Sequence, residues 1–202
     1  MRLLPKKVET KQPLNNVLLI HGANSTSASF NYLKANLPEA NYSNLSYDTM
    51  NGFYFNLERM LDATDENQTY DIISHSMGGL YALHLSQHRK LRRVVSIATP
   101  FNGAAIADWA RYMMPYYPLF RDVHTRSLPI KQCSEIVVQV PWLQLVTTRG
   151  NVPWLKFPND GVVTVNSMTA RKDVSYVHVD ENHNEVMLSD IAVKHTNEFL
   201  FG

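Results

Sequence analysis

The sequence contains a serine whose neighbours could make it a nucleophile. Ser76 lies in the stretch YDIISHSMGGLYALHL, residues 70–85, where an apolar run rich in β-branched residues gives way to apolar residues at helical spacing. Gly78 and Gly79 break the run, so the pattern predicts a strand, a tight turn at Ser76 and a helix. A turn this sharp favours a positive φ at its central residue.

The residues around this turn are small, as the expected geometry requires. Ser74 and Gly78 lie two positions before and after Ser76, and the usual pattern is G-x-S-x-G. Ser74 replaces the first glycine of that pattern but keeps the small size. The N-terminus of the following helix would favour negative charge beside the serine oxygen. The alternative is an ordinary strand-to-helix loop with a capping serine, because short motifs recur by chance.

A serine hydroxyl needs a base to take its proton, and a histidine oriented by a carboxylate can do so. Of the eight histidines, His183 is the candidate base because it follows the last expected strand in the polar loop VDENHNEVML. His21 follows the first expected strand. His75 is adjacent to Ser76 and is expected to point away from it, as neighbouring strand residues do. The alternative for His183 is a solvated loop histidine.

The orienting acid is expected in the loop that follows the preceding strand. Asp160 lies there, in FPNDGVVTVNS. Its competitors are Asp173, at the wrong end of the last strand, and Asp180, which is expected to continue that strand. The order Ser76, Asp160, His183 is the chain order of a nucleophile-elbow architecture.

A tetrahedral intermediate on the serine would carry an oxyanion, which backbone N–H groups must meet. One candidate donor is Met77, the residue after the nucleophile, and the other is Ala23 in the segment HGANS after the first strand. Gly22 would let the backbone approach closely there. The alternative is that this segment is only a tight turn.

Apolar runs alternate with helical patterns along the chain and must position these residues. Strands are expected at residues 17–20, 44–47, 70–75, 94–98, 142–147 and 174–179, and helices at 29–37, 53–65, from Met77, and at 189–200. This alternation predicts one α/β domain, residues 1–202, with a mostly parallel sheet of about six strands and helices on both faces. Active sites in such folds lie beyond the carboxyl ends of the strands, where the candidate residues are expected.

The segment 101–141 separates two expected strands by more than a single crossover needs. It is rich in aromatic residues and methionine: Phe101, Trp109, Tyr112, Met113, Met114, Tyr116, Tyr117 and Phe120. It is therefore a candidate cap or lid, a short helical insertion that lines an acyl or aromatic pocket. The alternative is a helical excursion that only packs onto the sheet.

The composition excludes several classes of partner. A net charge of +1 gives no reason to expect nucleic acid, and a single cysteine, Cys133, allows no intrachain disulfide. The first residues lack the apolar run of a secretory signal, and no stretch approaches the roughly 20 apolar residues of a membrane span. We therefore expect a cytoplasmic protein without an integral membrane segment. The aromatic insertion leaves contact with a membrane surface open.

The five motifs together resemble the α/β-hydrolase family, and within it the compact bacterial lipases and esterases. VLLIHGANS resembles the oxyanion segment, SHSMGG the nucleophile elbow, ATPFNGA the segment after the next strand, NDGVVTVNS the acid loop and NHNEV the histidine loop. The resemblance implies an esterase that acts through an acyl-enzyme. It implies Ser76 as nucleophile, His183 as base, Asp160 as orienting acid, and Ala23 and Met77 as oxyanion donors.

The resemblance also bears on metals and substrates. Some of these lipases bind a structural calcium near the histidine loop, but Asn184 and Glu185 lie there without a second carboxylate that can be placed beside them, so we expect neither metal nor cofactor. The expected substrate is a small-molecule or lipid ester. A thioesterase or amidase would use the same triad. A non-catalytic binding protein on a hydrolase scaffold is the alternative from a different class.

Overall fold

The computed structural model describes residues 14–150, 152 and 157–202. Its six strands form a sheet in the order β2-β1-β3-β4-β5-β6, and every neighbouring pair is parallel. The strands are β1 Asn16–Ile20, β2 Asn41–Asn44, β3 Thr69–His75, β4 Lys90–Ile97, β5 Trp142–Thr147 and β6 Ser175–Val179. The predicted parallel sheet of about six strands is confirmed.

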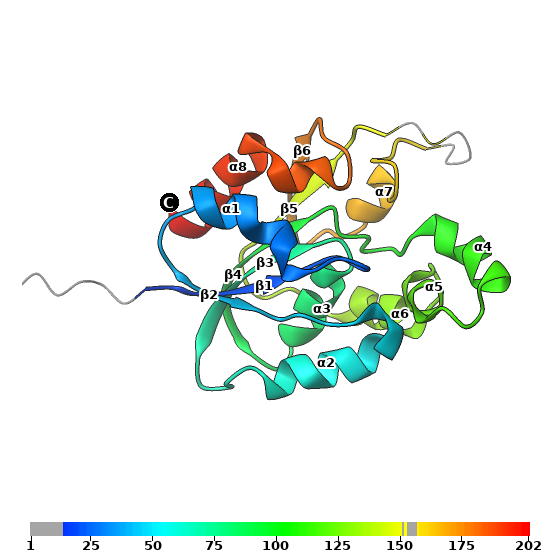
Figure 1. The fold of residues 1–202 in the computed structure, drawn as a ribbon, viewed down its shortest axis with the longest axis horizontal. Helices are drawn as coiled ribbons and strands as arrows, with labels where there is room; N and C mark the ends of the chain where they lie inside the picture. The colour runs from blue at the N-terminus through cyan, green and yellow to red at the C-terminus, as the bar shows by residue number, and fades with distance from the viewer. Residues whose placement is uncertain (1–13, 151, 153–156) are drawn as a thin grey trace, which may run out of the picture.

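Helices cover both faces of the sheet (Figure 1). One face carries α1 and α8, and the other carries α2 and α3. Their bounds are α1 Asn31–Asn36, α2 Phe53–Asp62, α3 Gly78–Leu85 and α8 Asp190–Phe201. Shorter elements complete the connections: η1 Ser27–Phe30, η2 Thr49–Asn51, α7 Val165–Met168 and η3 Glu185–Leu188.

The central strands are buried on both faces, which explains their continuous apolar runs. Alternate residues point to opposite sides of the sheet. Leu18, Ile20 and Ile72 lie in the core beneath α2 and α3. Val17, Leu19 and Ile73 lie in the core beneath α1 and α8. The sheet is therefore held between two packed layers of helices, which fix the positions of the strand ends.

The second strand differs from the prediction, which placed it at residues 44–47. It spans Asn41–Asn44 and, among the described strands, lies at the edge of the sheet beside β1. Its residues are polar and mostly exposed, so the strand carries no apolar pattern. The apolar residues that suggested a strand, Leu45 and Tyr47, lie just beyond its carboxyl end and pack into the core.

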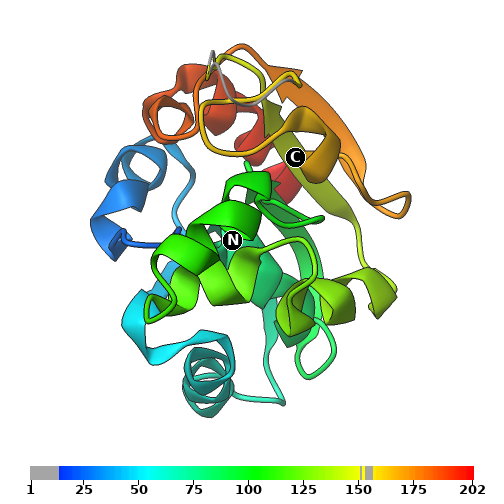
Figure 2. The same cartoon turned by 90° about the vertical axis from the view of Figure 1, so that its right-hand side faces the viewer.

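The insertion between β4 and β5 folds into three helices, α4 Ala105–Met113, α5 Pro118–Val123 and α6 Leu128–Glu135. They lie beyond the carboxyl ends of the strands, and Figure 2 looks onto them. Their inner side is buried through Ala107, Val123 and Ile130. In the part of the chain that the structure describes, no helix combines the length and the apolar character that crossing a membrane requires.

Candidate active site

Ser76 sits at a sharp turn between β3 and α3. Its φ is +51°, the positive value expected at the centre of such a turn. Its N–H donates to the carbonyl of Ile97 at the end of β4, at 2.8 Å. A Cβ at Gly78 would lie only 2.2 Å from the carbonyl oxygen of Ile20, so a glycine is needed where α3 passes β1. The turn thus leaves the Ser76 side chain at the carboxyl edge of the sheet.

The His183 ring lies between Ser76 and Asp160. Its Nδ1 is 2.7 Å from Asp160 Oδ2, and its Nε2 is 3.0 Å from Ser76 Oγ. A carboxylate only accepts hydrogen bonds, so Nδ1 carries the proton and Nε2 presents its lone pair to the Ser76 hydroxyl. The structure therefore brings together the three side chains that the sequence singled out, from loops after three different strands.

Asp160 is buried, and each of its oxygens is hydrogen-bonded. Oδ1 accepts from the N–H groups of Val162 at 2.9 Å and Val163 at 2.7 Å, while Oδ2 accepts from the Thr147 hydroxyl. Burial alone would raise the pKa of this carboxyl. The hydrogen bonds and the charge of His183 outweigh burial and hold the pKa of Asp160 below its usual value. The group is thus a fixed carboxylate that can orient His183.

The two amides proposed as oxyanion donors are free. Within residues 14–150, 152 and 157–202, neither the Ala23 N–H nor the Met77 N–H donates a hydrogen bond to another residue. Ala23 and Met77 line the same cavity as Ser76. Met77 also caps the N-terminus of α3, where the helix dipole favours negative charge.

The cavity beside Ser76 is small and apolar, with a volume of about 100 Å³. The insertion forms half of its wall, through residues from α4, α5 and the turn before α4: Ala104, Ile106, Ala107, Leu119, Phe120 and Val123. Val162 and Val163 close it from the acid loop. A cavity of this character can hold an aliphatic or aromatic group attached to a carbonyl at Ser76.

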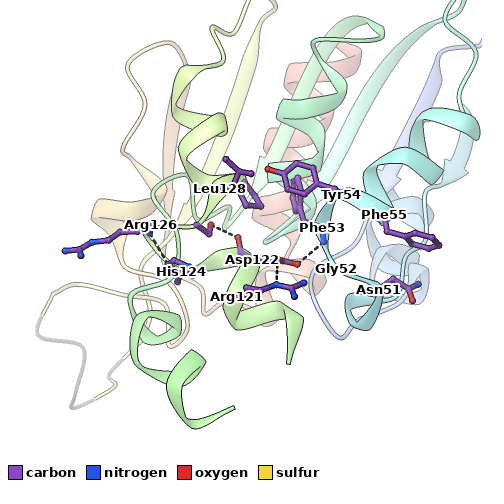
Figure 3. A pocket seen from close by; sticks show the side chains of 12 residues that line it. Asn51, Gly52, Phe53, Tyr54, Phe55, Arg121, Asp122, His124, Arg126 and Leu128 are labelled. Carbon is purple, nitrogen blue, oxygen red and sulfur yellow. Dashed lines mark hydrogen bonds and ion pairs between the residues drawn. The ribbon is translucent and has the colours of Figure 1, made fainter. Parts of the chain in front are cut away.

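A larger cavity of about 410 Å³ lies against the other face of α5 (Figure 3). Two of its polar lining residues, Asp122 and Ser127, form hydrogen bonds that stabilise the fold. The Asp122 carboxylate accepts from the Phe53 N–H at the start of α2, at 2.8 Å, and the Ser127 hydroxyl donates to the Asp122 carbonyl, at 2.7 Å. Ser76 is not among its lining residues. Size alone therefore does not identify the reactive site.

The competing residues lie elsewhere. The ring of His21 stacks on Tyr47 with centroids 4.4 Å apart, and its Nε2 accepts from the Tyr47 N–H. Asp173 forms an ion pair with Arg171 at 2.6 Å. Asp180 is exposed just after β6. In the described part of the chain, neither Asp173 nor Asp180 forms a hydrogen bond or an ion pair with His183.

Two residues at the site were not predicted from the sequence. Thr147 ends β5 and donates to Asp160; its place at the carboxyl end of a strand was a usable signal. Asn24 follows Ala23, has a φ of +54°, and accepts from the Tyr117 hydroxyl of the insertion. No spacing in the sequence indicates that second contact, since 93 residues separate the partners.

Across the described residues, no group of three or more His, Cys, Asp or Glu side chains is arranged to hold a metal ion.

Comparison with known proteins finds similarity in structure but not in sequence. No family model matches the chain, and no curated protein matches it. Among solved structures, it is similar to Bacillus licheniformis lipase BlEst2 in mature form, with a TM-score of 0.66, 15% identity, and 94% of each chain covered. It is also similar to RedJ, a thioesterase from the prodiginine biosynthetic pathway of Streptomyces coelicolor, with a TM-score of 0.54, 13% identity, and 96% of each chain covered.

A third similar structure is phospholipase PlaB from Legionella pneumophila, with a TM-score of 0.59 and 15% identity. The match covers 75% of this chain and 45% of PlaB, so the chain spans less than half of that protein. At these identities the likeness concerns the fold. The parallel six-strand sheet and these structural neighbours show that this chain has the α/β-hydrolase fold.

Proposed function

We propose that this protein is a serine hydrolase that cleaves carboxylic esters through an acyl-enzyme on Ser76. The observation that carries the proposal is the unbroken line of hydrogen bonds from Ser76 Oγ through His183 to Asp160. This line opens on an apolar cavity that also contains the free amides of Ala23 and Met77.

The reaction follows from that geometry. Ser76 Oγ attacks the ester carbonyl carbon while His183 Nε2 takes the hydroxyl proton, and the Asp160 carboxylate stabilises the imidazolium. The carbonyl oxygen becomes an oxyanion that accepts from the N–H groups of Ala23 and Met77. His183 then returns the proton to the leaving alcohol as the carbon–oxygen bond breaks. Water, deprotonated by His183, attacks the acyl-enzyme, and the acid leaves with Ser76 restored.

The neighbouring structures agree with this reaction class. Two of these neighbours are named as a lipase and a phospholipase, names that denote hydrolysis of esters by those proteins. A thioesterase among the same neighbours favours a second candidate, hydrolysis of a thioester by the same residues. An amide substrate would need no change in the residues either. The leaving group therefore has to be identified by experiment.

The outer side of the insertion suggests how a lipid ester would be reached. α4 and the turn after it expose Trp109, Tyr112, Met113 and Tyr116. Aromatic side chains of this kind suit the interface between lipid and water. We therefore extend the proposal to contact with a lipid surface. Trp109→Ala with Tyr116→Ser should reduce flotation with liposomes while leaving hydrolysis of a water-soluble ester unchanged. Equal flotation of the variant and the wild type would contradict the proposed contact with a lipid surface.

The leading proposal is tested by turnover of p-nitrophenyl esters from acetate to dodecanoate, beside a matched thioester and a matched anilide. We expect the wild-type protein to prefer the oxygen ester and Ser76→Ala to be inactive on all three. Preference for the thioester would favour the second candidate. Turnover by Ser76→Ala at the wild-type rate would contradict the mechanism, and no turnover by the wild type would favour a binding protein.

A further inference from the structure

His75 is buried beside the proposed catalytic residues, although the reaction described above does not use it. Its Nε2 is 2.8 Å from the main-chain carbonyl oxygen of His183. A carbonyl only accepts, so Nε2 carries the proton and donates it to His183. The other nitrogen, Nδ1, is buried and has no hydrogen-bond partner among the described residues. The ring is thus committed to a single hydrogen bond.

That bond completes a set of contacts around His183. The His183 N–H donates to the Asp160 carbonyl at 3.1 Å, and the His183 ring donates to the Asp160 carboxylate. Among the residues that the structure describes, no other group donates a hydrogen bond to the carbonyl of His183, which is itself a buried residue. With His75 in place, both main-chain groups of the base and its Nδ1 are held, which leaves Nε2 to face Ser76.

We propose that His75 is a positioning residue that ties the histidine loop to the nucleophile turn. This inference rests on the proposed function. His75 directly precedes Ser76, so its hydrogen bond to His183 connects the base to the residue next to the nucleophile. The two histidines are 108 residues apart in the sequence. A small error in the position of the base slows a reaction strongly, by about 10² for a displacement of about 1 Å.

A neutral ring suits this position. Burial, reinforced by the charge of His183, lowers the pKa of His75 to about 3. Asp160 and His21 also act on it, the carboxylate in favour of a charged ring and His21 against it. Because His75 stays neutral, it adds no second positive charge when His183 is protonated during the reaction. A lysine or arginine donor here would add one.

Gly22 leaves room for the His75 ring. A Cβ at Gly22 would lie 2.9 Å from His75 Nδ1, so any larger residue in the oxyanion segment would press on the ring. The glycine therefore also lets His75 keep its bond to His183. The alternative role for His75 is simply to fill space beneath the loop.

Two substitutions of similar shape separate positioning from space filling. His75→Gln retains an N–H donor near Nε2, and His75→Met has nearly the same length and volume without a donor. We expect His75→Met to lower kcat on a p-nitrophenyl ester by about 10- to 100-fold with little change in KM. His75→Gln should stay within about fivefold of wild type, and both variants should keep the wild-type pH profile of kcat/KM.

Equal losses of kcat in the two variants would overturn the positioning role, since packing alone would explain them. A wild-type kcat in His75→Met would overturn it as well. If the wild-type protein neither turns over esters nor reacts with a fluorophosphonate, the proposed function fails, and this role fails with it. A reactive wild type whose two variants are alike overturns only the inference about His75.

One measurement needs no variant and covers the case in which a variant fails to fold. Nitrogen-15 NMR of the wild-type protein near pH 6 should show a neutral His75 protonated on Nε2. A proton on Nδ1, or a charged ring, would contradict the hydrogen bond to His183 and overturn the inference.

Discussion

Two adjoining parts of the molecule are held in different ways. One is the cluster formed by the side chains of Ser76, Asp160 and His183, and the other is the helical insertion that covers this cluster. Asp160 and His183 are 1% and 6% exposed, and their polar atoms are hydrogen-bonded to one another or to the surrounding loops. The insertion leaves Trp109 66% and Tyr116 93% exposed.

This difference separates two tasks. A buried polar group without its partner costs free energy, so the cluster has essentially one arrangement in which every group is satisfied. Apolar contacts are less directional, and the wall that α4 and α5 provide can change shape without loss of the cluster. We infer that the cluster sets the reaction and that the insertion sets which acyl group enters.

The largest expected effect is the loss of the base. His183→Ala should lower kcat by up to roughly 10⁶, because the hydroxyl of Ser76 is then not deprotonated. The measurement is ester turnover, with folding checked by circular dichroism. His195→Ala is the control, because His195 lies on α8 and is 3.6 Å from Glu198 rather than at the site. Comparable losses in the two variants would argue against a special role for His183.

A smaller loss is expected when the acid becomes an amide. Asp160→Asn keeps the size of the side chain but allows the wrong tautomer of His183, and an analogous change in a serine protease lowers kcat by about 10⁴. Steady-state kinetics measure the effect. Asp173→Asn, which disturbs the ion pair with Arg171 and the hydrogen bond from the Val138 N–H, should keep full turnover. A loss of less than tenfold in Asp160→Asn would show that this carboxylate does not orient the base.

The insertion should respond through selectivity. Ala107 is buried in α4 and lines the cavity, so Ala107→Leu should fill part of its roughly 100 Å³. We expect kcat/KM for octanoate esters to fall by about 10- to 100-fold and that for acetate to change by less than about threefold. Ala105→Leu, at an exposed position of the same helix, is the matched control. Equal losses for all chain lengths would mean that the acyl group does not occupy this cavity.

The smallest expected effect concerns stability. The folded protein keeps His75 neutral down to a pKa of about 3, while the unfolded chain takes up a proton near the ordinary pKa of 6.5. The stability from the neutral ring is therefore fully present above pH 6.5 and is lost as pH falls toward 3. Between pH 7 and pH 5 this loss is about 2 kcal/mol.

His75→Gln has no group that titrates there, so its free energy of unfolding should fall less than that of the wild-type protein over the same range. Urea unfolding at both pH values measures the difference. Parallel curves for the two proteins would show that the ring titrates alike in the folded and unfolded states.

The sequence predicted the parts of this arrangement that follow from local patterns. Ser76 comes directly after an apolar run, and His183 and Asp160 lie in the loops that follow two others, so the ends of the strands could be located from periodicity. The edge strand Asn41–Asn44 could not, because its exposed polar residues have no apolar alternation.

Contacts between distant segments could not be predicted either. His75 looked like an ordinary strand residue, and its hydrogen bond to His183 depends on how the last loop folds back over β3. The bond between Asn24 and Tyr117 likewise requires the insertion to be in place. Such contacts depend on tertiary packing and leave no spacing in the chain.

The most direct test of the central claim is labelling with a fluorophosphonate, followed by mass spectrometry of the peptides. We predict a single label on Ser76, absent from heat-denatured protein and strongly slowed in His183→Ala, because the serine reacts only when its base is in place. A protein that hydrolyses esters while Ser76 stays unlabelled, or that carries the label on another residue, would contradict the account.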